Sequence, residues 1–454
     1  MNGILKVLID IASTPAILVG LIAVLGLCLQ KKPAGDVVRG GIKTFVGFLV
    51  LTGGSTVLQA ALTPFGEIFQ EAFHMQGVVP NNEAIVAMGL EQFGTYTALI
   101  MLLSMAFNIL IARFTKYKYI YLTGHAILYM SCMTAVILSV TGMSAVMIVL
   151  VGGLAVGLAN TIMPAIAQPY TKKITGNDSV ALGHTGDVGY ALSGWVGSFF
   201  KKDKKSTEDI NFPQGLSFLR DSTVSITITM GIVYLVVAIC CGPAYIEANL
   251  SDGTNYIVYV LQQAGSFAAG VFIILAGVRL ILAEIIPAFK GISEKLVPHA
   301  IPALDCPIVF PYAPNAVLMG FLASFVGGLV SMVIMIFTGT IVVIPGVVPH
   351  FFCGATAGVY GNSTGGVKGC LAGSFLHGIL ISFMPLLLMP VLGNLGFAGS
   401  TFSDTDYGVV GIFLGGLANL GGAGAIICGV LAVLLVVFGL SWVSKKKKAQ
   451  APEA

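Results

Sequence analysis

The sequence predicts an all-α polytopic membrane protein of about eleven transmembrane helices, several of them broken or re-entrant. Of its 454 residues, 56% are hydrophobic and only 9% are charged, whereas soluble domains are roughly 25% charged. Apolar runs long enough to cross a bilayer recur along almost the whole chain. This composition excludes a soluble enzyme, a nucleic-acid-binding protein and a disordered scaffold.

The individual crossings follow from the length of each apolar run. A helix needs about 20 mostly apolar residues to span the hydrocarbon core, and fewer when its flanking side chains reach the interface. We predict crossings at 14–30, 45–62, 95–112, 119–140, 144–163, 222–241, 256–278, 317–338, 347–366, 371–392 and 411–441.

The few charges predict how the chain is oriented. All but two of the 23 Lys and Arg residues fall in the segments 31–43, 113–118, 170–220, 279–295 and 445–448. The intervening segments 63–94, 242–255 and 393–408 carry only acids, among them Glu83, Asp404 and Asp406. Basic loops stay in the cytoplasm, so we expect the N-terminus outside and the C-terminus inside. An odd number of crossings requires the same result.

We expect residues 1–454 to form one membrane domain. It divides into a first half, a cytoplasmic loop with a hairpin, a second half, a last helix and a cytoplasmic tail: 14–163, 164–221, 222–392, 411–441 and 445–454. Five crossings in each half allow two repeats of inverted orientation, which is a recurrent transporter plan. The run KKDKKSTED (201–209) is either an ordinary basic anchor or a docking surface for an acidic or phosphorylated partner.

Three segments cannot be plain spanning helices. Residues 298–316 contain five prolines, each of which removes a backbone donor and clashes with the preceding turn. Residues 351–369 are rich in glycine, and residues 176–195 mix polar with apolar side chains as a re-entrant hairpin does. Non-helical backbone at membrane depth has to be buried in protein or line a wet cavity, so these segments mark a candidate site.

The candidate site residues are polar side chains within apolar surroundings. Asp305 stands between two prolines, His125 lies in a predicted crossing, and His184 lies in the predicted hairpin with Asp187 nearby. Ser55 follows a glycine pair that frees backbone groups. Each could instead be a structural interhelical hydrogen bond. Together they favour a neutral, polyol- or sugar-like ligand, which needs many directional hydrogen bonds and little net charge.

The chain carries no motif for catalysis of its own. It has no phosphate-cradling glycine loop, no nucleophile elbow and no spacing typical of metal ligands, so we expect no cofactor and no metal. The eight cysteines lie mostly in apolar runs and are interpreted as small buried hydrophobes. Any energy for transport would have to come from another chain.

Five stretches together resemble the ascorbate-type IIC permease component of the bacterial phosphoenolpyruvate-dependent phosphotransferase system. They are GIKTFVGFLVLTGGS (41–55), LTGHAILY (122–129), ALGHTG (181–186), ALDCPIVFPYAPNAVLMGF (303–321) and IVVIPGVVPHFFCGATAGV (341–359). The resemblance covers about residues 15–440 in order, and its APNAVxxGF and TGH segments are the most specific parts.

The resemblance implies a homodimeric permease in the bacterial cell membrane, embedded in lipid. Each protomer would have a dimerising domain and a mobile core domain that carries the substrate in an elevator-type motion. A separate IIB protein, supplied by IIA, would donate a phosphoryl group from its cysteine to the substrate on the cytoplasmic side. The expected substrate is small and polyhydroxylated: ascorbate, or a related sugar or sugar alcohol.

The resemblance also assigns site residues. The family's binding positions that are retained fall on Ser55, His125, His184 and Asp305. Four positions depart from the ascorbate pattern: Tyr129 and Thr185 replace two glutamines, and Asn82-Glu83 replaces a Thr-Tyr pair. Losing two amides and gaining an acid changes which hydroxyl pattern the site can satisfy, because an unpaired buried polar group costs about 1–3 kcal/mol.

Two other functions remain open on the sequence alone. One is a secondary transporter of the same architecture, driven by an ion gradient through Asp305 and Glu83. The other is a passive facilitator or a substrate sensor. In the leading hypothesis Asp305 or His184 could act as the base when the substrate is phosphorylated, while His125 and Ser55 fix its orientation.

Overall fold

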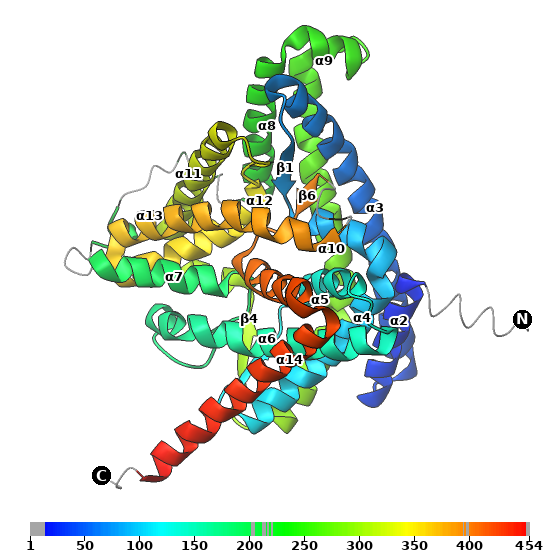
Figure 1. Ribbon diagram of the computed structural model, residues 1–454, viewed down its shortest axis with the longest axis vertical. Coiled ribbons are helices and arrows are strands. Elements are labelled where there is room, and N and C mark those ends of the chain that lie inside the picture. Colours follow the sequence, from blue (N-terminus) through cyan, green and yellow to red (C-terminus); the bar gives the residue numbers. More distant parts are fainter. Residues whose placement is uncertain are drawn as a thin grey trace, which may run out of the picture.

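The computed structural model describes residues 14–200, 205–210, 215, 218, 221–393, 395 and 399–450. Within this part, eight helical runs are long and apolar enough to cross a membrane, and one shorter apolar helix accompanies them. The chain is therefore a mostly helical, multi-pass membrane protein (Figure 1).

The first half of the chain alternates long helices with very short strands. Its elements are α2 (Pro15–Leu29), α3 (Ala34–Phe73), β1 (Gly77–Pro80), α4 (Asn82–Phe114), β2 (Tyr119–Tyr121), α5 (Gly124–Ser139), α6 (Ala145–Thr175), β3 (Ala181–Leu182) and α7 (Asp187–Gly197), followed by the 3-10 turns η1 (Ser198–Phe200) and η2 (Thr207–Asp209).

The second half repeats this alternation. Its helices are α8 (Ser222–Cys241), α9 (Pro243–Asn249), α10 (Tyr256–Leu296), α11 (Pro314–Thr338), α12 (Val347–Pro349), α13 (Ala355–Leu388) and α14 (Thr405–Gln450). Its strands and short turns are β4 (Ile301–Leu304), η4 (Cys306–Ile308), η5 (Phe310–Tyr312), β5 (Val342–Val343), the π-helical η6 (His350–Gly354), η7 (Met389–Val391) and β6 (Ser400–Thr401).

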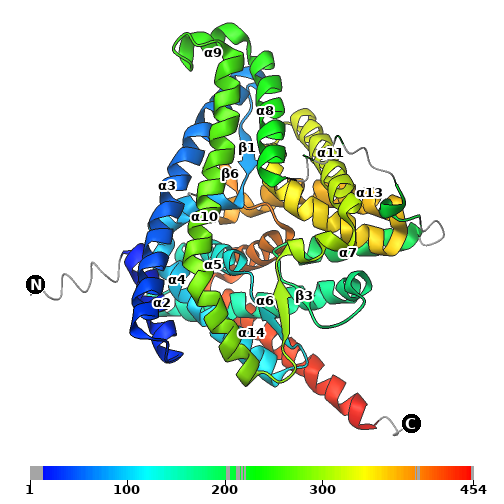
Figure 2. The same cartoon turned by 180° about the vertical axis from the view of Figure 1, so that it is seen from behind.

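Long helices α3 and α10 pack along one another at one side of the molecule, with α2 and α8 beside them (Figures 1 and 2). Small residues permit this close approach: a Cβ atom on Gly47 would lie 2.8 Å from the carbonyl oxygen of Gly277. Such contacts between small residues are the usual way in which membrane helices associate. The remaining helices form a body in which α11, α13 and α7 pack together and α4 packs on α6.

Two small parallel sheets connect the halves of the chain. In one, β4 of the second half lies between β2 and β3 of the first half; in the other, β1 of the first half lies between β5 and β6 of the second half. These pairings satisfy backbone groups of extended segments inside a membrane protein, where water is scarce. Most of the proline-rich segment 298–316 is accordingly not α-helical: it forms β4 and two 3-10 turns, and α11 begins only at Pro314.

Glycine breaks two of the long helices. In α13 the break is at Gly366 (φ 61°, ψ −148°), and Gly361 and Gly369 on its two sides are in contact, so the chain doubles back. The two arms correspond to the separate crossings predicted at 347–366 and 371–392. In α14, by contrast, the break at Gly421 and Gly422 divides what we predicted as one continuous crossing at 411–441, and that prediction is wrong in this respect.

A second correction concerns the crossing predicted at 119–140. Its first three residues form β2, which pairs with β4, and the helix that follows runs only from Gly124 to Ser139. The pairing with β4 takes the place of the first helical turn. As a result the chain enters α5 from a strand, and the residues of the TGH segment lie at the junction.

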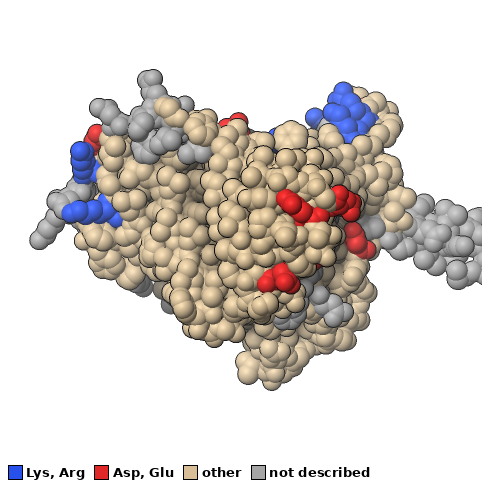
Figure 3. All heavy atoms as spheres, turned by 90° about the horizontal axis from the view of Figure 1, so that it is seen from above, with Lys and Arg blue, Asp and Glu red and all other residues tan. Residues whose placement is uncertain are grey.

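A third correction concerns the acidic segment 393–408. Asp404 and Asp406 are 2% and 1% exposed, although we predicted that this segment lies between two crossings. Glu83, in the acidic segment 63–94, is also buried, at 6% exposed. Most of the face seen in Figure 3 carries neither charge; several acids gather in one region, while other acids and the Lys and Arg side chains lie at the margins.

Candidate functional site

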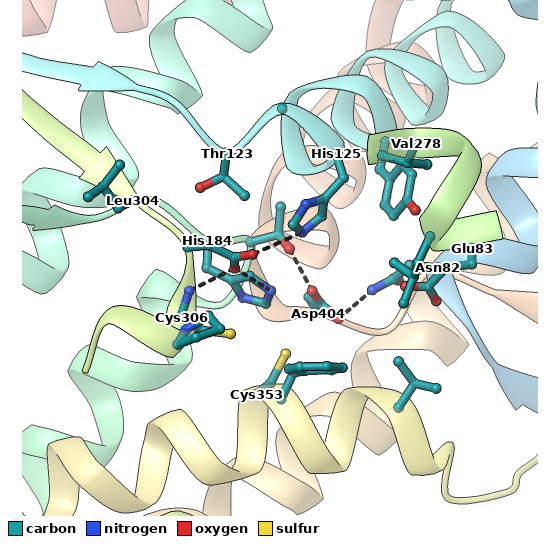
Figure 4. Close-up of a pocket in the computed structure, with 18 of the residues that line it drawn as sticks. Asn82, Glu83, Thr123, His125, His184, Val278, Leu304, Cys306, Cys353 and Asp404 are labelled. Carbon is teal, nitrogen blue, oxygen red and sulfur yellow. Dashed lines mark hydrogen bonds and ion pairs between the residues drawn. The ribbon is translucent and has the colours of Figure 1, made fainter. Parts of the chain in front are cut away.

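A cavity of about 690 Å³ lies where the two sheets meet. Its size is within the usual range for small-molecule sites, about 300–1,000 Å³. Polar residues that follow five of the six strands line it, while α10 and η6 supply a largely apolar wall. Figure 4 shows the polar side chains pointing towards a common centre.

The sheet β2–β4–β3 brings three predicted residues to one edge of the cavity. His125 follows β2, Asp305 follows β4 and His184 follows β3, and the carboxyl ends of parallel strands meet at the same edge. A glycine permits the close pairing: a Cβ on Gly183 would lie 2.7 Å from the carbonyl carbon and oxygen of Ala303. The sequence therefore assembles this group through strand pairing between its two halves.

Asp305 lies between the two imidazoles. Its Oδ2 is 3.8 Å from His125 Nε2, and its Oδ1 is 3.9 Å from His184 Nε2. Both separations are too long for a direct hydrogen bond, so a ligand hydroxyl or a water can lie between the groups. The Asp305 side chain is 41% exposed because it faces the cavity, and its Oδ1 accepts from Cys306 N at 2.7 Å.

His184 is held by the residues behind it. Its Nδ1 is 2.6 Å from the Tyr190 hydroxyl, and the two rings stack with centroids 6.0 Å apart. This contact fixes the ring orientation and directs Nε2 to the cavity. The His125 ring is 6.2 Å from that of His184 and 5.8 Å from that of Tyr129, so the two histidines form adjacent walls.

The sheet β5–β1–β6 supplies the opposite edge. Asn82 follows β1 and Asp404 follows β6. The Asp404 carboxylate accepts three hydrogen bonds, from Asn82 Nδ2 at 2.7 Å, Thr185 Oγ1 at 2.5 Å and Ser403 Oγ at 2.8 Å. Figure 4 shows Asp404 between the Asn82 side and the His184 side of the cavity. The hydrogen bonds of Asp404 therefore connect residues that follow strands of both sheets, at the wall of the cavity.

Three buried polar atoms at the cavity have no hydrogen-bond partner among the described residues. They are Glu83 Oε2, Thr123 Oγ1 and the Tyr129 hydroxyl, and all three residues line the cavity. Buried polar groups normally have partners. These three are therefore candidates for direct contacts with a ligand.

Within the described part of the chain, two groups of side chains have donor atoms close enough together to hold a metal ion. One is His125, His184 and Asp305, and the other is His184, Cys353 and Asp404; within each group the donor atoms lie within 4.8 Å of one another. Sequence spacing could not reveal either group, because each combines residues from different strands.

Seven of the eight predicted site residues line the same cavity: Asn82, Glu83, His125, Tyr129, His184, Thr185 and Asp305. The eighth, Ser55, is on α3, and its side chain is outside the described residues. Sequence reasoning missed Thr123, Arg279 and Asp404, which also line the cavity. We had assigned Arg279 to a cytoplasmic basic segment, but it lies on α10 and lines the cavity. A single charge at the end of an apolar run was the feature of the sequence that could have identified it.

Comparisons with known proteins give a consistent picture. Residues 10–406 match the family model described as "PTS system sugar-specific permease component" (EIIC-GAT). The chain is also similar to the "Ascorbate-specific PTS system EIIC component" of Mycoplasma pneumoniae, with 26% identity over 426 aligned residues. That alignment covers 81% of this chain and 64% of the relative, so the chain spans less than two thirds of the relative's length.

Proposed function

Since this chain belongs to the family of PTS sugar-specific permease components, we propose that it carries a small polyhydroxylated substrate across the bacterial cell membrane. Transport would be coupled to phosphorylation of the substrate by a separate IIB protein, which IIA supplies. Ascorbate, the substrate named for the relative, and related sugars or sugar alcohols are the candidate class.

The observation that carries this proposal is the group of Asp305, His125 and His184 at the cavity. A carboxylate 3.8 and 3.9 Å from two imidazole nitrogens leaves room for a hydroxyl that donates to the carboxylate and accepts from an imidazole. Asn82, Thr185 and Tyr129 add amide and hydroxyl groups along the wall. Such a mixture of donors and acceptors suits a neutral ligand with several hydroxyls.

The same group can assist phosphoryl transfer. In this proposal a substrate hydroxyl held at Asp305 attacks the phosphorus of a phosphocysteine on IIB. The new O–P bond forms as the P–S bond breaks, the thiolate leaves with the electron pair, and the hydroxyl proton passes to Asp305 or His184. His184 suits this role because Tyr190 holds its Nδ1 and leaves Nε2 facing the cavity.

We further propose that the two halves of the chain are inverted repeats and that the core moves in an elevator-type manner within a homodimer. Supporting this, β4, which comes after residue 222, pairs with two strands that come before it, whereas β1, which comes before residue 222, pairs with two strands that come after it. The basic segments would face the cytoplasm and IIB, with the N-terminus outside and the C-terminus inside.

An ion-coupled transporter of the same architecture is the second candidate. It is favoured by the buried carboxyl groups of Glu83 and Asp404 at the cavity. Uptake into vesicles that contain this chain distinguishes the two. We expect accumulation only when phosphorylated IIB is enclosed, with phosphorylated product and no effect of ionophores. Ionophore-sensitive uptake of unmodified solute without IIB would contradict the proposal.

A further inference from the structure

Glu83 is placed by local structure at a wall of the cavity. It is in the first turn of α4, where Asn81 caps the helix by accepting from Ala84 N at 2.7 Å. A carboxylate in the first turn of a helix is favoured by the helix dipole. The residue is 6% exposed and is one of the residues that line the cavity.

The Glu83 carboxyl has no basic partner. Among the described residues, the close carboxylate–imidazole contacts at the cavity join Asp305 to His125 and His184, and none includes Glu83. Its buried Oε2 also lacks a hydrogen-bond donor within the described part of the chain. Because an ionised carboxylate can only accept, a ligand group that satisfies it has to be a donor.

The carboxylate of the neighbouring Asp404 has hydrogen-bond partners without a ligand. Its oxygens already accept from Asn82, Thr185 and Ser403. The described lining of the cavity thus contains three carboxyl groups, from Glu83, Asp305 and Asp404, against one guanidinium, from Arg279. This balance disfavours an anion, since like charges repel strongly when they are partly desolvated.

Building on the function proposed above, we propose that Glu83 makes this site selective for an uncharged polyol over an anionic sugar acid. One ligand hydroxyl donates to Glu83 Oε2. The hydroxyls of Tyr129 and Thr123, which also lack partners in the described chain, bond two other ligand oxygens. A carboxylate or an ionised enol in place of the first hydroxyl cannot donate, and it meets the negative charge of Glu83.

The test uses matched ligands that differ by one carboxylate. Glucitol is compared with gluconate, and xylitol with xylonate, with ascorbate as a further anion. Binding to the purified full chain is measured calorimetrically at pH 8 without IIB. In the best-bound pair we expect the alditol to bind at least tenfold more tightly than the acid, which is about 1.4 kcal/mol. Equal or tighter binding of the acid, or of ascorbate, would overturn the proposal.

Variants assign the preference to Glu83. We expect Glu83→Gln to bring the ratio of the two affinities to threefold or less, and Glu83→Asp, which keeps the charge, to hold it above fivefold. Tyr129→Phe should weaken both ligands by a similar factor and leave the ratio within twofold of the wild type. Glu91→Gln, at an exposed position on the same helix, is the control. An unchanged ratio in Glu83→Gln would contradict the assignment.

The binding results test the charge selectivity separately from the proposal of a polyhydroxylated substrate. If the chain binds acids rather than alditols, the charge selectivity proposed here is wrong, while permease function stands. If it binds neither series, the proposal of a polyhydroxylated substrate fails, and the selectivity proposal fails with it.

Discussion

Replacing Asp305 by Asn tests the candidate site at its centre. Asp305 Oδ1 accepts from the backbone of Cys306 at 2.7 Å, and Asn retains one oxygen that can accept the same bond. The fold around η4 should therefore persist. The change removes the negative charge and one acceptor between His125 and His184, at distances of 3.8 and 3.9 Å.

The magnitude follows from the hydrogen bond that is lost. A bond between a hydroxyl and an ionised partner contributes roughly 1.5–3 kcal/mol, so affinity for the substrate should fall by about 10- to 150-fold. Equilibrium binding to the purified chain measures this directly. Asp252→Asn is the matched control, because Asp252 is exposed and has a positive φ of 49°, a conformation that Asn tolerates. Binding by Asp305→Asn within threefold of the wild type would refute the assignment.

Three further predictions concern the support of the site. Asp404→Leu leaves three donors without their acceptor and should lower the free energy of unfolding by about 2–5 kcal/mol, measured as a loss of thermal stability in detergent; an unchanged melting temperature would count against the network. Tyr190→Phe removes the group that orients His184 and should reduce substrate affinity about fivefold, a loss of about 1 kcal/mol, with little change in melting temperature. If affinity is unchanged, the hydroxyl does not position the ring. Gly183→Val puts a side chain against Ala303 of β4 and should abolish folded protein on size-exclusion chromatography, whereas normal yield would contradict the strand pairing.

Part of the fold could be predicted because the length of an apolar run, and the prolines and glycines within it, determine the local conformation of the backbone. The prolines of 298–316 exclude a continuous helix, and the structure has β4 and two 3-10 turns before α11 begins at Pro314. The break at Gly421 and Gly422 lies in a glycine cluster, 414–424, which stands out in the sequence because close packing of helices does not account for it. We nevertheless predicted one crossing at 411–441, because the residues on both sides of the cluster are as apolar as those of a continuous helix.

The site could be predicted only in part for a related reason. His125, His184 and Asp305 are noticeable in sequence because each interrupts apolar surroundings. Asp404 instead lies in the segment 393–408, which has no Lys or Arg and falls between two predicted crossings, whereas β6 pairs with β1 and carries Asp404 into the cavity. Pairings between strands of two to four residues leave almost no pattern in the sequence.

The central claim is that a substrate held at Asp305 receives a phosphoryl group from IIB. It is tested most directly by single-turnover transfer from labelled phosphorylated IIB to an alditol in the presence of the purified chain. We predict that label appears in the alditol with the wild-type chain and at least tenfold less with Asp305→Asn. Label that reaches the alditol equally without the chain or with Asp305→Asn, or that never leaves IIB while the alditol is bound, would contradict the account.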